Sequence, residues 1–281
     1  MVTKEQGKIV LDWDGTVTDI NSRAETYIDP FINLAAKEIN VNESELKEMM
    51  NSATQVVHKY PDKYSWEWKG VPTSAPTDTF LIHQSALRIV LKQLTGKPSF
   101  NSAENDLIVK LHEHGRSMMD LVSQPGVGEF IDSLKDSGGV VVVTSSGTQA
   151  VERELGQILG SEHGVGVHGE ARKFVIDTNF KKLKHSTTQP YPYPRPVSLQ
   201  RPHYFDVLTD LKTVKLVLGD MSELDLFLPQ AMGIPTALKR SPTTPYWEVE
   251  YYDQKPQSGL NRFLIGDYSN AMEVLGDVLK R

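Results

Sequence analysis

Short apolar runs that end in polar residues recur along the chain and predict buried strands. The first run ends at Leu11 and is followed at once by Asp12 and Asp14. An uninterrupted run of Ile, Val and Leu of this length is typical of a parallel strand that is buried on both faces. The predicted strands cover residues 9–11, 140–143, 165–168, 215–218 and 234–238. Of these, the run at 140–143 is β-branched throughout and gives the clearest signal.

A long helical pattern separates the first strand from the others. Between residues 20 and 121, apolar residues recur at helical spacing. Asn42 begins a capping box that opens one helix, Asp78 precedes a second and Asn101 a third. The stretch between the first two helices, residues 60–76, is predicted as a loop. No strand is expected in this part of the chain.

Together these patterns predict an α/β fold with two domains. Residues 1–19 and 122–281 are expected to form a Rossmann-like, doubly wound and mainly parallel sheet, and residues 20–121 an inserted all-helical domain. A Pro-rich loop at 181–202 interrupts the second half, and loops of this length are usually functional or disordered. The aromatic residues at 246–247 are predicted to lie in a loop.

Acidic and hydroxyl residues follow three of the predicted strands. Asp12 and Asp14 follow the first, Thr144 follows the run at 140–143, and Asp220 and Asp225 follow the run at 215–218. In open α/β sheets, ligands bind beyond the carboxyl ends of the strands, and right-handed crossovers bring such ends to one edge. Two aspartates one residue apart repel each other unless a cation or a proton lies between them.

Taken alone, each of these residues has a simpler structural interpretation. Asp12 and Asp14 could be turn formers, since Asp and Gly are common after strands. Thr144 could merely cap the helix that is predicted after it. The argument for chemistry therefore rests on the order in which the groups occur.

That order resembles a known family. A hydrophobic strand followed by Asp12, one residue, Asp14, Gly15 and Thr16 resembles the first motif of the haloacid dehalogenase-like (HAD) hydrolase superfamily. Thr144 and the acids at 220 and 225 stand in the order of the second and fourth motifs of that family. The resemblance covers residues 8–19 and about 122–240.

The resemblance implies roles for these residues in phosphoryl transfer. Asp12 would attack phosphorus and become an aspartyl phosphate, which is a form of covalent catalysis by a carboxylate. Asp14 would protonate the leaving oxygen and then activate water. The phosphate group would be bound by Thr144, Ser145, Ser146 and Gly147, at the start of a helix where backbone amides form an anion site.

A cation is required because a dianionic substrate must approach aspartates. Mg²⁺ fits, since it takes oxygen ligands and is usually held by one or two carboxylates together with phosphate and water. By resemblance, its protein ligands would be the Asp12 carboxylate, the Asp14 backbone carbonyl and the Asp220 carboxylate. Asp225 would be a further ligand or a support for the others.

The third motif of the family is a lysine or arginine that holds the attacking aspartate and the phosphate. Arg201 is our preferred candidate, because Arg201-Pro202 precedes the helix before the last acidic strand. Lys182 is the alternative. Either residue could instead be a solvated surface cation, which is the commoner place for Lys and Arg.

The second acid narrows the reaction. Expulsion of an alkoxide from a phosphate ester needs a general acid, whereas expulsion of a halide does not, so Asp14 favours a phosphatase over a dehalogenase. Residues 20–121 resemble the cap domain that closes over such sites, and a cap of this size implies a small soluble phosphate ester as substrate. A phosphomutase and a catalytically inactive HAD-like binding or regulatory protein are the alternatives.

Composition restricts the other classes of function. The chain has 281 residues, of which 39% are hydrophobic and 23% charged, as in ordinary globular proteins. It has no cysteine, which excludes disulfides, thiolate metal sites and cysteine nucleophiles. A net charge of −6 without a basic run argues against a nucleic-acid partner. We find neither a secretion signal nor a membrane span, so a cytoplasmic location is expected, and the oligomeric state is not indicated.

Overall fold

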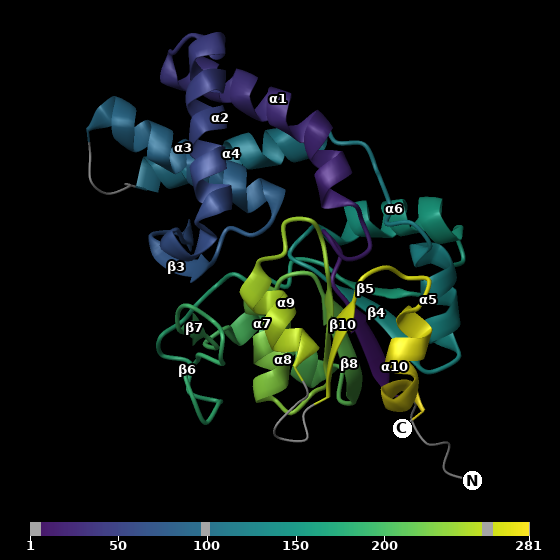
Figure 1. Ribbon diagram of the computed structural model, residues 1–281. Helices are drawn as coiled ribbons and strands as arrows, with labels where there is room; N and C mark the ends of the chain where they lie inside the picture. Colours follow the sequence, from purple (N-terminus) through teal and green to yellow (C-terminus); the bar gives the residue numbers. More distant parts are fainter. Residues whose placement is uncertain (1–6, 97–101, 255–260, 281) are drawn as a thin grey trace. The chain divides into compact units, whose positions relative to one another are not determined.

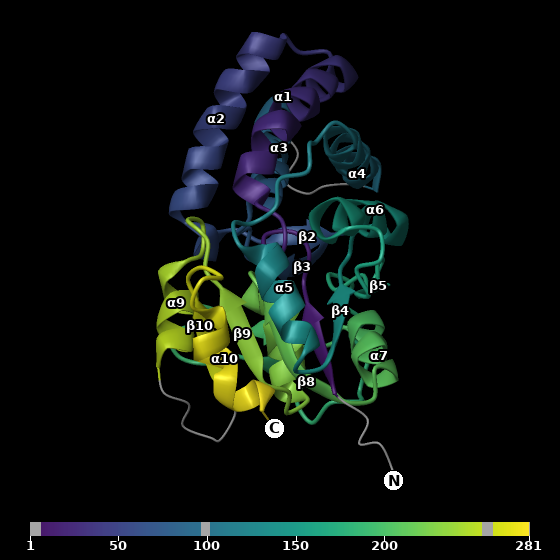
Figure 2. The same cartoon turned by 90° about the vertical axis from the view of Figure 1, so that its right-hand side faces the viewer.

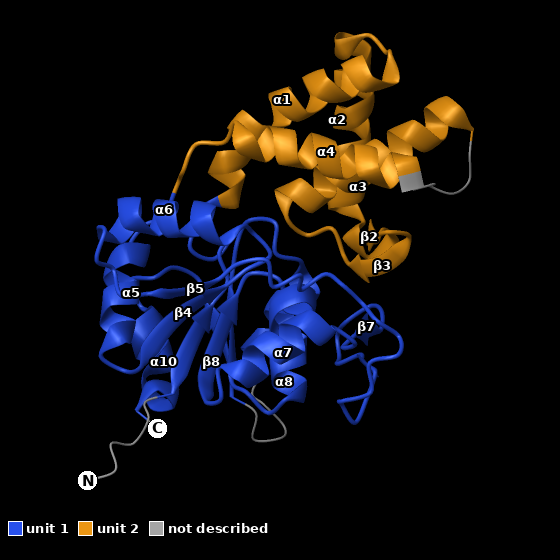
Figure 3. Cartoon of the chain, turned by 180° about the vertical axis from the view of Figure 1, so that it is seen from behind, with its two compact units in different colours: residues 1–19, 123–281 blue, residues 20–122 orange. Residues whose placement is uncertain are grey.

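The computed structural model describes residues 7–96, 102–254 and 261–280. The chain divides into two compact units, which are coloured separately in Figure 3. The first contains Met1–Asp19 and Ser123–Arg281, and the second contains Ile20–Val122. The second unit ends at Val122, one residue after the end at residue 121 that the sequence predicts.

A six-stranded sheet forms the centre of the first unit, as Figure 1 shows. Its order is β10-β9-β8-β1-β4-β5, and each neighbouring pair is parallel. The strands are β1 (Lys8–Leu11), β4 (Gly139–Val143), β5 (Gly166–His168), β8 (Val214–Gly219), β9 (Thr236–Lys239) and β10 (Arg262–Ile265). The predicted Rossmann-like α/β fold is confirmed, although β10 had no recognisable signal.

Strand order runs outward from β1 in two directions. Chain order continues from β1 through β4 to β5 on one side, and then through β8, β9 and β10 on the other. The point where the order reverses is the place at which doubly wound sheets bind ligands. Asp12 therefore stands at the switch point.

Helices cover both faces of the sheet. They are α5 (Val127–Lys135), α6 (Thr148–Leu159), α7 (Pro202–Asp210), α8 (Phe227–Ala231), α9 (Tyr246–Asp253) and α10 (Ala271–Leu279). Val10 and Val217 point to one face and pack with Tyr204 of α7, Leu228 of α8 and Tyr252 of α9. Figure 2 shows α5 and α10 together on the other face. This burial on both faces explains why the strands are continuous apolar runs.

Helix α9 corrects the prediction of an aromatic loop at 246–247. Trp247 is buried and belongs to a cluster with Tyr193, Val197, Leu199 and Phe227. Three of these, Tyr193, Val197 and Leu199, lie in the Pro-rich loop, which also contains the short antiparallel strands β6 (Thr187–Thr188) and β7 (Val197–Ser198). Packing between distant segments, rather than local periodicity, thus determines this helix.

The second unit is built on four helices. They are α1 (Ile20–Ile39), α2 (Glu43–Lys59), α3 (Thr79–Thr95) and α4 (Ser102–Ser117), with a short 3₁₀ turn, η1 (Pro61–Lys63), after α2. The predicted caps are confirmed for two of them: Asn42 accepts from the amides of Ser44 and Glu45, and Asp78 accepts from the amide of Leu81. Asn101, the third predicted helix start, lies outside the described residues.

The prediction of an all-helical second unit is wrong at residues 60–76. This stretch contains an antiparallel hairpin of β2 (Trp66–Trp68) and β3 (Val71–Ser74). The connecting residues, Lys69 and Gly70, have φ values of 50° and 78°. Two consecutive left-handed residues are the signature of a two-residue hairpin turn. In the sequence, the Lys69-Gly70 pair is a signal for such a turn, whereas Pro72 argues against a strand because proline cannot donate a backbone hydrogen bond.

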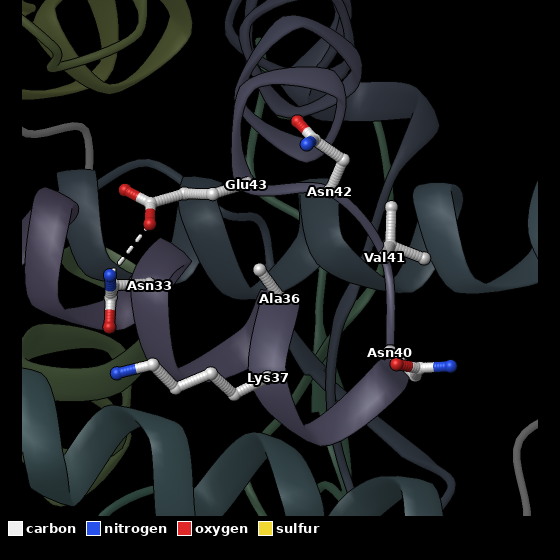
Figure 4. A pocket seen from close by; sticks show the side chains of 7 residues that line it. All are labelled: Asn33, Ala36, Lys37, Asn40, Val41, Asn42 and Glu43. Carbon is white, nitrogen blue, oxygen red and sulfur yellow. Dashed lines mark hydrogen bonds between the residues drawn. The ribbon is translucent and has the colours of Figure 1, made fainter.

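An open pocket of about 320 Å³ lies at the corner between α1 and α2. Figure 4 shows its lining, in which the Asn33 side-chain amide donates to Glu43 at 2.7 Å. The lining residues are Asn33, Ala36, Lys37, Asn40, Val41, Asn42 and Glu43. None of them is a predicted site residue.

Within the described part of the chain, no helix is both long and apolar enough to cross a lipid bilayer.

Candidate active site

Three buried carboxylates meet at the carboxyl edge of the central strands. Asp12 directly follows β1, and Asp220 directly follows β8. These strands are neighbours, with Leu11 paired to Leu218, so their ends emerge side by side. Each of Asp12, Asp220 and Asp225 offers an oxygen atom that lies within 4.8 Å of the others. The sheet thus brings together acids that are more than two hundred residues apart in the sequence.

Two glycines allow the acids to approach this closely. Gly15 has a φ of 84°, and a Cβ atom placed there would collide with the carboxylate of Asp220. A Cβ atom on Gly219 would collide with the side chain of Asp225. Only glycine fits both positions, because a left-handed backbone or a close contact leaves no room for a side chain. The glycines next to the acids are therefore part of the site.

A buried lysine lies between two of the carboxylates. The Lys173 ammonium is 2.6 Å from Asp12 Oδ1 and 2.8 Å from Asp225 Oδ1, and its side chain is only 4% exposed. Burial lowers the pKa of Lys173, but the charges of Asp12 and Asp225 outweigh burial and raise that pKa well above its ordinary value. Lys173 therefore carries its positive charge throughout the physiological pH range.

The cation that contacts Asp12 is Lys173, and not Arg201 or Lys182, which the sequence suggested. Arg201 is buried, but its guanidinium donates to the Lys173 carbonyl at 2.6 Å and to the Ser198 carbonyl at 3.2 Å. Lys182 is largely exposed and pairs with Asp206 at 2.8 Å. Arg201 thus supports the backbone of Lys173, the cation that contacts Asp12.

No local pattern marks Lys173 in the sequence. It lies five residues beyond β5, in a segment without regular structure, and its neighbours Glu170 and Arg172 have φ values of 57° and 46°. Left-handed residues of this kind redirect the chain in ways that residue type does not announce. Its position shortly after a strand of the sheet was the only available clue.

The pKa of the Asp12 carboxyl group is unusually high. Burial and the charge of Asp225 raise its pKa and the ammonium of Lys173 offsets part of this rise, which leaves the pKa at about 7. Lys173 contacts two of the three buried carboxylates, Asp12 and Asp225, and the charge of the buried Lys239 acts on the third, Asp220. The cluster consequently lacks positive charge, and either a proton or a bound cation would relieve it. A divalent ion with oxygen ligands fits this donor set.

Thr144 and Ser146, which follow β4, make different hydrogen bonds. Thr144 is buried at the end of the strand, and its hydroxyl accepts from the Ser146 amide at 3.1 Å. The Ser146 hydroxyl donates to Asp14 Oδ2 at 2.6 Å, so Ser146 orients the second acid, a contact that the sequence did not suggest. Ser145 and Gly147 are exposed at the N-terminus of α6. Free amides at a helix N-terminus favour anions.

The arrangement supplies the parts that acyl-phosphate chemistry requires. Asp12 is a carboxylate fixed by an ammonium, and Asp14 is a second acid two residues away that accepts a short hydrogen bond. An anion site at α6 and a cluster with excess negative charge flank them. Phosphoryl transfer uses groups of these kinds, namely a carboxylate, a second acid, a cation and an anion site.

Comparison with known proteins identifies the fold. No protein-family model and no curated protein match the sequence. Among solved structures, the chain resembles the HAD-hydrolase YfnB from Bacillus subtilis bound to magnesium, with a TM-score of 0.52 and 12% identity over 97% of this chain and 100% of that one. It also resembles a predicted phosphatase from Clostridium acetobutylicum, with a TM-score of 0.52 and 13% identity over 99% and 100% of the two chains. The chain therefore has the HAD-like fold, as the motifs led us to expect.

Proposed function

We propose that this HAD-like chain is a Mg²⁺-dependent phosphomonoester hydrolase that acts on a small soluble phosphate ester through an aspartyl phosphate. The observation that carries the proposal is the contact of Lys173 with both Asp12 and Asp225, beside Asp220, at the switch point of the sheet. Structural ion pairs rarely bury more acids than bases, because each unbalanced charge destabilises the folded state. Excess buried charge of this kind is characteristic of functional sites.

In the first half of the reaction, Asp12 attacks phosphorus and the ester bond breaks. Lys173 fixes the Asp12 carboxylate by a 2.6 Å hydrogen bond and stabilises negative charge on the phosphoryl oxygens. Asp14, oriented by Ser146, gives its proton to the departing alkoxide. Thr144 and the amides at the start of α6 hold the phosphate.

In the second half, the aspartyl phosphate is hydrolysed. Asp14 is now deprotonated and takes a proton from a water molecule, whose oxygen attacks phosphorus. Asp12 departs as a carboxylate, and inorganic phosphate is released. One residue thus serves as acid and then as base, as microscopic reversibility allows.

Mg²⁺, when bound, would neutralise the phosphate charge that otherwise repels the aspartates. Asp12, Asp220 and the backbone carbonyl of Asp14 are its proposed ligands. Asp225 fits a supporting role better, because its two carboxylate oxygens accept from the Lys173 ammonium at 2.8 Å and from the Met221 amide at 3.1 Å. These two contacts favour Asp225 as a support for the metal ligands over Asp225 as a ligand itself.

The test is release of inorganic phosphate from a panel of phosphate esters with and without MgCl₂. We expect metal-dependent release by the wild-type chain and a loss of at least about 10³-fold in Asp12→Asn, which cannot form the acyl phosphate. A single turnover in ¹⁸O-labelled water should place the label in inorganic phosphate and none in the Asp12 carboxylate, because the water attacks phosphorus and Asp12 departs with both of its own oxygens.

Three results would count against the proposal. Full activity of Asp12→Asn would exclude the covalent step. An isomerised ester instead of free phosphate would identify a phosphomutase. Failure on every ester with Mg²⁺ present would favour a binding or regulatory protein on this fold.

A further inference from the structure

The acid loop, residues 220–225, follows β8 and is not α-helical. Its last four residues belong to η2 (Ser222–Leu226), which has the wide hydrogen-bonding pattern of a π-helical turn. The Asp225 carboxylate accepts from the Met221 amide, and the Asp225 amide donates to the Met221 carbonyl at 2.8 Å. π-Helical turns are rare and less favourable than α-helix, so contacts from outside must maintain them.

Besides Lys173, three side chains from other segments supply such contacts. Glu248 of α9 accepts from the Ser222 hydroxyl at 2.7 Å and from the Ser222 amide at 3.2 Å. Tyr204 of α7 donates to the Asp225 carbonyl at 2.8 Å. The third contact is an ion pair between Glu223 of the acid loop and a residue of the Pro-rich loop, Arg195.

The ion pair between Arg195 and Glu223 has the geometry of a specific anchor. Arg195 Nη2 lies 2.7 Å from Glu223 Oε2, and Arg195 Nε lies 3.4 Å from Oε1, so both carboxylate oxygens are engaged. The Glu223 side chain is 4% exposed and that of Arg195 is 20% exposed. A forked, largely desolvated contact fixes orientation as well as distance.

The segment that carries Arg195 is itself fixed. Pro194 and Pro196 flank the arginine and restrict the backbone on both sides. Tyr193 is buried and its ring packs edge-on against Phe227, with centroids 4.7 Å apart. The backbone around Arg195 is therefore restricted, so that less conformational entropy is lost when Arg195 pairs with the acid loop.

We propose that Arg195 is a positioning residue for the metal-binding acids: through Glu223 it clamps the acid loop in the form that directs Asp220 and Asp225 toward Asp12. This inference rests on the proposed function. Residues behind the direct ligands of a metal commonly change affinity 10–100-fold when they are removed, because the ligands lose their orientation. The Pro-rich loop is thereby given a role in the site.

Charge alone predicts the opposite result, which makes the clamp testable. Removal of the Arg195 charge makes the neighbourhood more negative and should tighten cation binding if electrostatics were the whole effect. Loss of the clamp should weaken binding. The direction of the change therefore separates a positioning role from a simple charge effect.

The first measurement is hydrogen–deuterium exchange of the metal-free chain over residues 219–227. We expect Arg195→Met to accelerate exchange there at least tenfold, and Arg195→Lys, which keeps the charge but loses the fork, to have a smaller effect. Asp206→Asn removes the exposed ion pair with Lys182 and is the matched control. Unchanged exchange in Arg195→Met would overturn the clamp.

The second measurement is the dissociation constant for Mn²⁺, obtained from the electron paramagnetic resonance signal of the free ion without substrate. We expect Arg195→Met to raise it tenfold or more, and Asp206→Asn to leave it within twofold. A lower or an unchanged dissociation constant in Arg195→Met would overturn the inference. If Arg195→Met does not fold, Arg195→Lys is measured in its place. We expect its dissociation constant for Mn²⁺ to be at least three times that of the wild type, and an unchanged constant would overturn the inference.

The two measurements also separate this inference from the proposed function. If the wild-type chain does not bind Mn²⁺, the proposed metal dependence fails together with the predicted change in affinity. If it binds Mn²⁺ and hydrolyses esters while Arg195→Met shows wild-type exchange and affinity, only the clamp is wrong.

Discussion

One buried polar network of the second unit differs from the acid cluster of the first unit. In the second unit, the Trp66 indole donates to Gln84 at 3.0 Å, and both Gln84 and Tyr27 contact His112 Nδ1 at 3.2 Å. These partners form a neutral hydrogen-bond chain that joins β2, α3, α4 and α1. In the first unit, the corresponding buried groups are ions, with Asp12 and Asp225 sharing one ammonium.

This difference separates a structural network from a functional one. A neutral chain whose donors and acceptors are matched can hold helices together and needs nothing further. A buried cluster with more acids than bases is stable only while the remaining charge is met by a proton or a ligand. The charge imbalance, rather than burial itself, points to the carboxyl edge of the sheet as the site of chemistry.

The largest expected effect is that of Lys173→Met. Removal of the ammonium leaves Asp12 and Asp225 in mutual repulsion and withdraws the group that stabilises the phosphoryl charge. We expect kcat to fall at least about 10³-fold, within the range found when such electrostatic groups are removed. Phosphate release by purified variants measures this effect.

Lys182→Met is the control for that experiment, because Lys182 is exposed and pairs only across the surface with Asp206. It should keep kcat within twofold. If Lys182→Met were the inactive variant and Lys173→Met the active one, the assignment of the cation would be reversed.

A smaller effect is expected from the buried acid Glu248. Burial raises the pKa of Glu248 and the hydrogen bonds from Ser222 offset part of this rise, so that the pKa is about 8 instead of the ordinary 4.5. The folded state thus binds a proton more tightly than the unfolded state. Its contribution to stability is complete below pH 4.5 and is lost as pH rises through about 8.

Glu248→Gln should remove this pH dependence, because an amide still accepts from Ser222 but does not ionise. We expect the variant to exceed the wild type in unfolding free energy by on the order of 1–3 kcal/mol at pH 9, with little difference near pH 5. Urea unfolding at the two pH values measures it. Equal pH slopes for the two proteins would show that Glu248 ionises freely in the folded state.

The smallest effect is expected in the neutral network. Gln84→Leu leaves the Trp66 indole without its acceptor, and the unfolding free energy should fall by about 1–3 kcal/mol, the usual cost of a buried unsatisfied group. Gln93→Leu, on an exposed position of the same helix, is the control and should stay within about 0.5 kcal/mol. The Mn²⁺ affinity should not change in either variant. A large loss of metal affinity in Gln84→Leu would abolish the distinction between the two networks.

Local patterns were sufficient wherever a few neighbouring residues decide the structure. Asn42 and Asp78 cap helices because their side chains satisfy amides two or three residues away. The run at 140–143 forms a central strand because its apolar β-branched residues must be covered on both faces. The same reasoning failed for the hairpin around Lys69 and for α9, where packing against distant residues outweighs propensity.

The sequence by itself determined the α/β class, the position of the insertion and the strand ends that carry Asp12, Thr144 and Asp220, because each depends on short-range periodicity and on the rule that parallel strands end at one edge. Only the tertiary structure decided which cation meets Asp12, that Ser146 orients Asp14 and that Arg195 reaches the acid loop. These contacts join residues from 28 to 161 positions apart. Their geometry depends on left-handed turns and long loops, whose paths are set by the packing of the whole unit and not by the residues that form them.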